Sequence, residues 1–333
     1  MTSVSEPVIS VSHLKKHFSV YKKRPGLLAS IRSLWQREYE TVAAVDDISF
    51  TINQGEVVGF IGQNGAGKTT TLKILSGLLY PTSGEVSVLG YNPWDRKSAF
   101  QKQFSLVLGQ KNQLWWDLPA METFLLNQAI YDIPEAQFRK TLNKLVALLA
   151  VADCVQIQVR KLSLGQRMKC ELIAALLHNP KVLFLDEPTI GLDVVMQKTL
   201  RDFIAEYNRE FKATVILTSH YMDDVKELCE RVIMIDHGKK IYDGLLSNII
   251  SKYARNKILS VIFSTSVTKK SLAEFGTIKD WDGSTATLLV PRKEATKQAA
   301  RLLESLPVQD LNIEEAPLEA IIREVFGNKA QSA

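Results

Sequence analysis

Two patterns of apolar residues alternate along most of this chain. Short apolar runs at 57–61, 182–185 and 215–217 are typical of strands buried on both faces of a parallel sheet. Between them, apolar residues recur every three or four positions at 70–79 and 167–178, which predicts helices. Because 333 residues suffice for a large domain and an appendage, we expect an α/β domain over 1–245.

The pattern changes after Gly244. Residues 257–263, 277–281, 285–291 and 308–314 are predicted strands, and 269–275 and 294–306 are predicted helices. The order βαββαβ suggests a small ferredoxin-like α+β domain over 246–333. A last helix over 318–326 is expected to stop at Gly327. This domain contains no catalytic constellation, so we expect a role in dimerisation or regulation.

The strand at 57–61 leads directly into a glycine-rich loop and a helix. This loop, Gly62-Gln-Asn-Gly-Ala-Gly-Lys-Thr69, fits the Walker A pattern without mismatch. Its glycines allow backbone N–H groups to surround an oxyanion at a helix N-terminus. Lys68 can reach the β and γ phosphates of ATP, and the Thr69 hydroxyl can ligate Mg²⁺. The predicted ATP-binding residues of this loop are Gly62, Gln63, Asn64, Gly65, Ala66, Gly67, Lys68, Thr69 and Thr70.

A second signal for nucleotide chemistry is the pair of acids that follows the apolar strand 182–185. The carboxyl end of such a strand faces the ligand crevice of an α/β sheet. We therefore expect Asp186 to hold Mg²⁺ through water and Glu187 to polarise the attacking water.

Between these motifs, Leu162-Ser-Leu-Gly-Gln166 opens a predicted helix and forms a second anion site. Here the sequence resembles the ABC ATPase family, whose signature reads Leu-Ser-Gly-Gly-Gln. In that family the signature closes over the ATP of a second subunit, which here implicates Ser163, Leu164, Gly165 and Gln166. Leu164 replaces the first signature glycine, so its side chain must point away from the nucleotide.

The resemblance covers about residues 8–245 and assigns further roles. Gln110 resembles the glutamine that contacts Mg²⁺ and the attacking water, Asp193 the residue that communicates between subunits, and His220 the histidine near the γ-phosphate. Phe18 aligns best with the aromatic platform for adenine, with Tyr21 as a competitor, and either ring could instead belong to the core.

The resemblance also implies architecture and partners. It implies an antiparallel β-subdomain, a helical subdomain over about 105–178, and a dimer formed around two ATP with a second copy or a paralogue. The helical subdomain would dock on a separate transmembrane permease, with Trp115 and Trp116 either at the edge of that dock or in the core. The surrounding sequence is similar to ATPases of bacterial exporters of drugs, lipids or polysaccharides.

A basic insertion interrupts the likeness at about residues 19–40. The segment 13–40 carries seven basic and two acidic side chains, which accounts for the whole net charge of +5. Residues 25–37 have the apolar spacing of a short amphipathic helix with Trp35, and segment 22–37 is predicted to contact the membrane surface. The alternatives are a solvated basic loop or a helix packed on the chain's own β-subdomain.

Other features bear on location and on competing functions. No apolar run approaches the roughly 18 residues of a membrane span, and three separated cysteines indicate reduced thiols. We expect a protein at the cytoplasmic face of the inner membrane, held there by its permease. The alternative is a soluble ABC ATPase acting on ribosomes or DNA. A single Walker A and only about 95 residues between Lys68 and Ser163 argue against it, so no nucleic-acid partner is expected.

Overall fold

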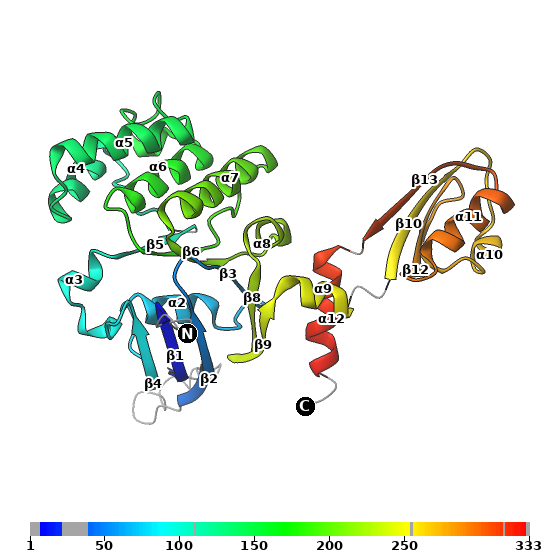
Figure 1. Ribbon diagram of the computed structural model, residues 1–333, viewed down its shortest axis with the longest axis horizontal. Coiled ribbons are helices and arrows are strands. Elements are labelled where there is room, and N and C mark those ends of the chain that lie inside the picture. Colours follow the sequence, from blue (N-terminus) through cyan, green and yellow to red (C-terminus); the bar gives the residue numbers. More distant parts are fainter. Residues whose placement is uncertain (1–6, 22–38, 110, 254–255, 316, 331–333) are drawn as a thin grey trace, which may run out of the picture. The chain divides into compact units, whose positions relative to one another are not determined.

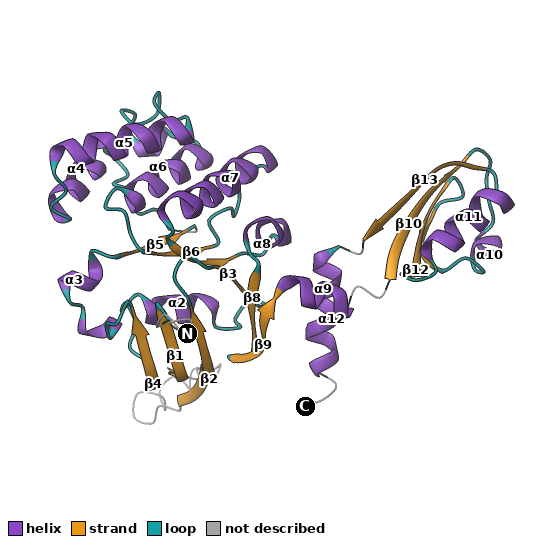
Figure 2. Ribbon diagram, viewed as in Figure 1, coloured by secondary structure: helices purple, strands orange, loops and turns teal. Residues whose placement is uncertain are grey.

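The computed structural model describes residues 7–21, 39–109, 111–253, 256–315 and 317–330. The chain divides into two compact units, Met1–Gly244 and Leu245–Ala333. Each unit has its own sheets and its own apolar core, coloured by sequence in Figure 1 and by secondary structure in Figure 2.

The first unit contains a three-stranded antiparallel sheet in the order β2-β1-β4. Its strands are β1 (Ile9–Tyr21), β2 (Tyr39–Ile52) and β4 (Ser83–Val88). The β1–β2 pairing extends to Tyr21 opposite Tyr39. Residues 19–21 and 39–40, which we expected in the insertion, therefore belong to this sheet. The predicted helix at 25–37 lies outside the described residues.

The central sheet of this unit has six strands in the order β5-β6-β7-β3-β8-β9. They are β5 (Phe104–Leu108), β6 (Val182–Asp186), β7 (Thr214–Thr218), β3 (Val57–Ile61), β8 (Arg231–Asp236) and β9 (Lys239–Leu245). The first five are parallel to one another, as the fully apolar runs predict. Residues 105–108, expected in the helical subdomain, instead form edge strand β5 because they pair with β6.

Helices cover the central sheet. Those of the first unit are α2 (Lys68–Leu75), η1 (Pro93–Asp95), α3 (Ser98–Gln101), α4 (Ala120–Ile130), α5 (Glu135–Leu149), η2 (Val159–Lys161), α6 (Leu164–Leu176), α7 (Val194–Phe211) and α8 (Met222–Leu228). Helices α4 to α7 gather on one side of the central sheet, whereas α2 lies between the central and the three-stranded sheet (Figure 1).

Helix α2 ends earlier than the predicted 70–79. Gly77 adopts φ +72°, and its N–H donates to Ile74 O at 3.0 Å while Leu78 N–H donates to Lys73 O at 2.9 Å. These two bonds form a Schellman motif, which terminates a helix at a left-handed residue. A Cβ at Gly77 would lie 2.2 Å from Pro93 O, so this turn requires glycine.

The second unit contains a four-stranded antiparallel sheet in the order β11-β12-β10-β13. Its elements follow the chain as β10 (Asn256–Phe263), α10 (Lys269–Leu272), β11 (Thr277–Trp281), β12 (Thr285–Pro291), α11 (Ala295–Ser305) and β13 (Val308–Glu315). This order is that of the split βαβ unit. Two further helices, α9 (Leu246–Tyr253) and α12 (Leu318–Ala330), contact each other. The expected stop at Gly327 is wrong, because one glycine costs a helix only about 1 kcal/mol.

Candidate nucleotide site

The glycine-rich loop joins the end of β3 to the start of α2. A Cβ at Gly62 would lie 2.3 Å from Ile235 O, and one at Gly67 would lie 2.3 Å from Ala44 O. Gly67 also has φ +104°, which side chains other than hydrogen rarely tolerate. Both glycines are therefore required for the loop to close against β8 and β2. The loop borders a hollow of about 280 Å³, here called the loop hollow.

Most of the predicted loop residues line this hollow, but Gly62 and Gln63 do not. Its lining consists of Ala44, Asn64, Gly65, Ala66, Gly67, Lys68, Thr69, Thr70 and Glu187. The Lys68 ammonium donates to Gly62 O at 2.7 Å and to Gln63 O at 3.1 Å. Burial lowers the pKa of Lys68, and the nearby charges of Glu187 and Asp186 act in the opposite direction.

The second predicted motif lies at the carboxyl end of β6. Asp186 accepts from the Thr69 hydroxyl at 2.8 Å through Oδ2 and from the Thr218 hydroxyl at 2.7 Å through Oδ1. A neighbouring hollow of about 240 Å³, the strand-end hollow, is lined by Thr69, Lys73, Leu108, Lys111, Asp186 and Glu187. Asp186 is thereby fixed next to the hydroxyl with which it is expected to share Mg²⁺.

The donor set suits a magnesium ion that also has phosphate oxygens and waters as ligands. Thr69 and Asp186 supply hard oxygen donors, which Mg²⁺ prefers over nitrogen and sulfur. The described residues contain no group of three or more His, Cys, Asp or Glu side chains arranged to hold a metal alone. The third expected ligand, Gln110, lies outside the described residues.

Glu187 and His220, two of the residues that the sequence predicts to be catalytic, lie against each other. His220 Nε2 lies 2.8 Å from Glu187 Oε1. Glu187 has φ +54°, and its backbone N–H donates to both Thr218 O and Thr218 Oγ1 at 3.0 Å. Thr218, which our sequence reasoning missed, therefore fixes both acids: its hydroxyl donates to Asp186 and accepts from Glu187. The signal for Thr218 that the sequence offered was a hydroxyl side chain at the end of an apolar strand.

The signature residues begin α6. Ser163 is its N-cap, and Ser163 and Gln166 exchange the two bonds of a capping box at 3.2 and 2.9 Å. A Cβ at Gly165 would lie 2.9 Å from Met196 Cγ, so a larger residue there would require the Met196 side chain to move. Leu164 is 37% exposed and packs near Gly191. Among described residues, none of the four signature residues lines either hollow of its own chain.

Asp193 and Phe18 lie outside both hollows. Asp193 is the N-cap of α7 and accepts from the Met196 N–H at 2.8 Å, so its side chain shapes the turn into α7. Phe18 on β1 is 37% exposed, with the Lys16 ammonium 5.0 Å from its ring centroid. Phe18 is therefore available at the surface, and nothing is described of the competing Tyr21 side chain.

The tryptophans after β5 are not core residues. Trp115 is 55% exposed and Trp116 is 49% exposed. The Arg167 guanidinium lies 5.9 Å from the Trp116 ring centroid. Of the two alternatives left open by the sequence, burial in the core is thus excluded, and a surface role remains.

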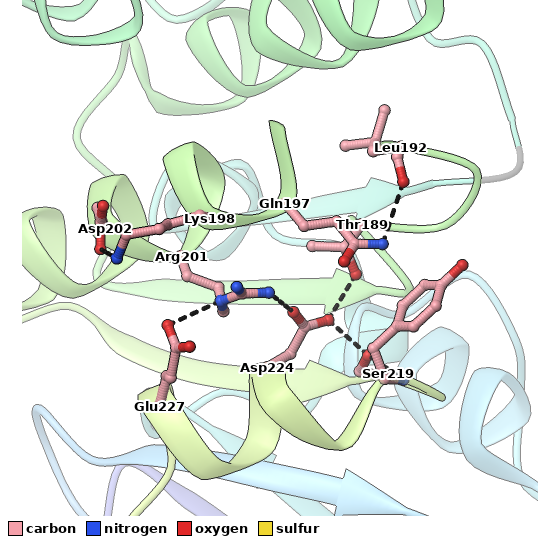
Figure 3. Close-up of polar contacts among 10 residues, drawn as sticks. Thr189, Leu192, Gln197, Lys198, Arg201, Asp202, Ser219, Asp224 and Glu227 are labelled. Atoms are coloured by element: carbon pink, nitrogen blue, oxygen red, sulfur yellow. Dashed lines mark hydrogen bonds and ion pairs between the residues drawn. The ribbon is translucent and has the colours of Figure 1, made fainter. Parts of the chain in front are cut away.

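A buried polar network connects the segments that follow β6 and β7 (Figure 3). Asp224, which is fully buried, accepts from the hydroxyls of Thr189 and Ser219 and from Arg201 Nη1 at 2.5, 2.6 and 3.0 Å. Arg201 also donates through Nε to Glu227 at 2.8 Å. The network thereby holds the turn next to His220 against the turn after Glu187 and against α7.

Our sequence reasoning missed this network. The available signal was an acid beside Met222 and Val225 on the apolar face of α8, where an unpaired charge would be costly.

Comparison with known proteins places the chain in a family. Residues 45–190 match the model of the ABC transporter family, and residues 255–314 match the model of the EvrA-like ABC transporter C-terminal domain. The ABC transporter ATP-binding protein NatA of Bacillus subtilis (strain 168) is 33% identical over 235 residues, which span 71% of this chain and 95% of NatA. The chain belongs to the family of ABC transporter ATP-binding proteins, and it is an ATPase.

Other relatives are named for different transport roles. The linearmycin resistance ATP-binding protein LnrL of Bacillus subtilis (strain 168) is 31% identical, over 69% of this chain and 73% of LnrL. The methionine import ATP-binding protein MetN of Geobacillus kaustophilus (strain HTA426) is 30% identical, over 65% of this chain and 64% of MetN. Relatives at similar identity are thus named for antibiotic resistance and for methionine import.

The fold also matches solved structures. A dimeric post-hydrolysis structure of the ATP-binding cassette MJ0796 with ADP and Pi superposes with a TM-score of 0.60 at 22% identity, covering 72% of this chain and 98% of that one. This establishes the ABC ATPase fold of the first unit. None of the described helices is long and apolar enough to cross a bilayer.

Proposed function

We propose that this chain binds MgATP in the two hollows and hydrolyses it with Glu187 and His220. The observation that carries the proposal is the 2.8 Å contact between these two side chains, next to Asp186 and the Lys68 loop. The backbone N–H groups of the loop and Lys68 bind the phosphates, and Phe18 stacks on adenine. Bound Mg²⁺ would offset phosphate charge, held by Thr69, Asp186 and Gln110.

In this proposal Glu187 orients the attacking water and accepts its proton, as a base within hydrogen-bond reach does. His220 holds the Glu187 carboxylate in place and donates toward the γ-phosphate. Thr218 keeps both acids at the strand ends, so their separation does not depend on the nucleotide.

We further propose that two chains, or this chain and a paralogue, dimerise around two ATP. Ser163 and Gly165 of one subunit would contact the nucleotide held by the other, and Asp193 would lie between the sites. Two observations support this arrangement. The signature residues line neither described hollow of their own chain, and Val194 and Val195 next to Asp193 are 76% and 77% exposed. Apolar side chains at such exposure suit an interface.

In this proposal ATP hydrolysis drives a separate transmembrane permease. The permease holds this chain at the cytoplasmic face of the membrane. The exposed Trp115 and Trp116 suit a docking surface, since aromatic side chains are enriched at protein interfaces. We propose export of an amphipathic, lipid or polysaccharide substrate. The antibiotic resistance named for LnrL and the basic segment 22–37 support this direction.

The test is hydrolysis by the purified chain and its Glu187→Gln variant. We expect the variant to bind ATP like the wild type but to hydrolyse it about 10² times more slowly, and to accumulate as an ATP-bound dimer. Lys68→Ala should lose ATP affinity, measured by calorimetry. Unchanged hydrolysis in Glu187→Gln would overturn the catalytic assignment, and stable binding to ribosomes or DNA without a membrane partner would overturn the transport role.

A further inference from the structure

A groove of about 430 Å³ lies beside the first helices of the helical subdomain and away from both hollows of the nucleotide site. It is bordered by β5, by α3, and by one face each of α4 and α6. Its walls include Phe104, Leu106, Ile130 and Ala174, and its polar lining includes Thr123 and Glu171. The groove lining is thus mixed, with apolar and uncharged polar side chains, one acid (Glu171) and one cation (Lys102).

Glu171 is an unusual residue to find in such a wall. Its side chain is 1% exposed, and its Oε1 receives the Gln113 N–H at 3.4 Å and lies 3.6 Å from Arg167 Nε. Its Oε2 has no hydrogen-bond partner among the described residues. Burial raises the pKa of Glu171 to about 7, while the Gln113 N–H and Arg167 act in the opposite direction. The chain therefore carries a buried carboxyl group that it does not itself satisfy.

Two further observations indicate that an outside group completes this site. The Thr123 hydroxyl, which lines the same groove, is also buried without a described hydrogen-bond partner. Arg167 lies over the Trp116 ring, and its Nε, which also has no hydrogen-bond partner among the described residues, lies 3.6 Å from Glu171 Oε1. The groove consequently offers an acceptor oxygen and a hydroxyl to whatever enters it, and buried polar groups are normally paired.

We propose that Glu171 binds a Lys or Arg side chain of a cytoplasmic segment of the transmembrane partner, with Oε2 as the acceptor. The proposal rests on the proposed role as a transporter ATPase. A cation satisfies Oε2 and stabilises the charged form of the carboxyl group, whereas a carboxylate would repel that charge. The aliphatic stem of Lys or Arg suits the apolar walls, including the 57% exposed Ile130 at the edge.

Such a contact would make Glu171 a determinant of partner choice. A buried acid rejects segments that lack a donor at the matching position, because its oxygen would then remain unpaired. The exposed aromatic side chains nearby can pack on many partners, while the carboxyl group adds a requirement for charge. Glu171 thus restricts which membrane subunit the ATPase serves.

The experiment measures affinity between the tagged chain and the detergent-solubilised transmembrane subunits of its own transporter. Glu171→Gln keeps the shape of the side chain and removes its charge, and we expect about tenfold weaker binding. Asp202→Asn, an exposed neutralisation on α7, is the matched control and should bind like the wild type. Glu171→Gln should also melt no lower than the wild type, which excludes loss of folding as the cause.

A charge exchange gives the decisive result. Glu171→Lys should abolish binding, and replacing one Lys or Arg of the cytoplasmic loops of the partner by Glu should restore it for this variant alone. Equal binding of the wild type and Glu171→Gln would overturn the pairing while leaving the proposed function intact. A wild-type chain that binds no transmembrane subunit would overturn both.

Discussion

Two buried carboxyl groups of the same unit have opposite environments. Asp224 accepts three hydrogen bonds from Thr189, Ser219 and Arg201, so its charge is satisfied within the chain. Glu171 is almost as deeply buried, but one of its oxygens has no partner among the described residues. A buried acid of the first kind holds segments together, whereas one of the second kind costs stability until another group arrives.

The difference between the two acids also concerns location. Asp224 ties together the turns next to Glu187 and His220, and it lines neither of the two nucleotide hollows. Glu171 lies in a groove lined by β5 and the helices, where a partner can reach it. Comparing the two therefore separates the proposed positioning of Glu187 and His220 from the proposed contact with another protein.

The largest effect should come from removing the satisfied acid. Asp224→Ala leaves Arg201 buried without its main partner, which typically costs about 3–5 kcal/mol of unfolding free energy. Chemical denaturation of the purified full chain, followed through the unfolding of its first unit, measures this loss. Asp224→Asn, which keeps two acceptor bonds, should cost less and lower kcat more than KM. An Asp224→Ala variant as stable as the wild type would show that the network is not needed for folding.

A smaller effect of opposite sign is expected at the unsatisfied acid. Because the pKa of Glu171 is raised to about 7 in the folded chain, folding favours its protonated form. The unfolded state releases that proton near pH 4.5, so this residue lowers stability as pH rises from about 4.5 to 7. Glu171→Gln should therefore stabilise the isolated chain by about 1–3 kcal/mol at pH 8 and by much less at pH 5.

Denaturation at both pH values checks this. The charged or titratable neighbours of Glu171 are Arg167, which lies beside it, and Lys102 and Tyr131, which line the groove; Lys102 is itself paired with Asp132. If the stability difference between Glu171→Gln and the wild type were equal at pH 5 and pH 8, Glu171 would titrate normally. The contrast with Asp224 would then disappear.

The sequence alone predicts some parts of this molecule well, for physical reasons. The strands at 57–61 and 182–186 and the loop between 62 and 69 follow from apolar runs and glycine spacing, which are local signals. The partners of Asp224 come from segments up to 35 residues away, so no local pattern reveals them. Helix ends were also misplaced, since the termination at Gly77 depends on contact with Pro93.

A third and smaller effect concerns the geometry of the pair at Asp224. Arg201 donates through Nη1 to Asp224 and through Nε to Glu227, which a single ammonium group cannot reproduce. Arg201→Lys should therefore lose about 1–2 kcal/mol, roughly the net value of one charged hydrogen bond. Thermal unfolding measures the loss. A Lys variant that matches the wild type would show that charge alone, without the fork of donors, holds the turns.

The smallest effect is expected at a pair on the same helix as Arg201. Lys198 and Asp202 lie one turn apart at 3.5 Å, and their side chains are 65% and 63% exposed (Figure 3). Exposed pairs four residues apart contribute about 0.3–0.5 kcal/mol because water screens both charges. Asp202→Asn should therefore shift unfolding by no more than that amount, and the shift should vanish in high salt. A larger loss of stability in Asp202→Asn would mean that the charges of α7 act together. Burial alone would then no longer explain why removing Asp224 costs more than removing an exposed acid.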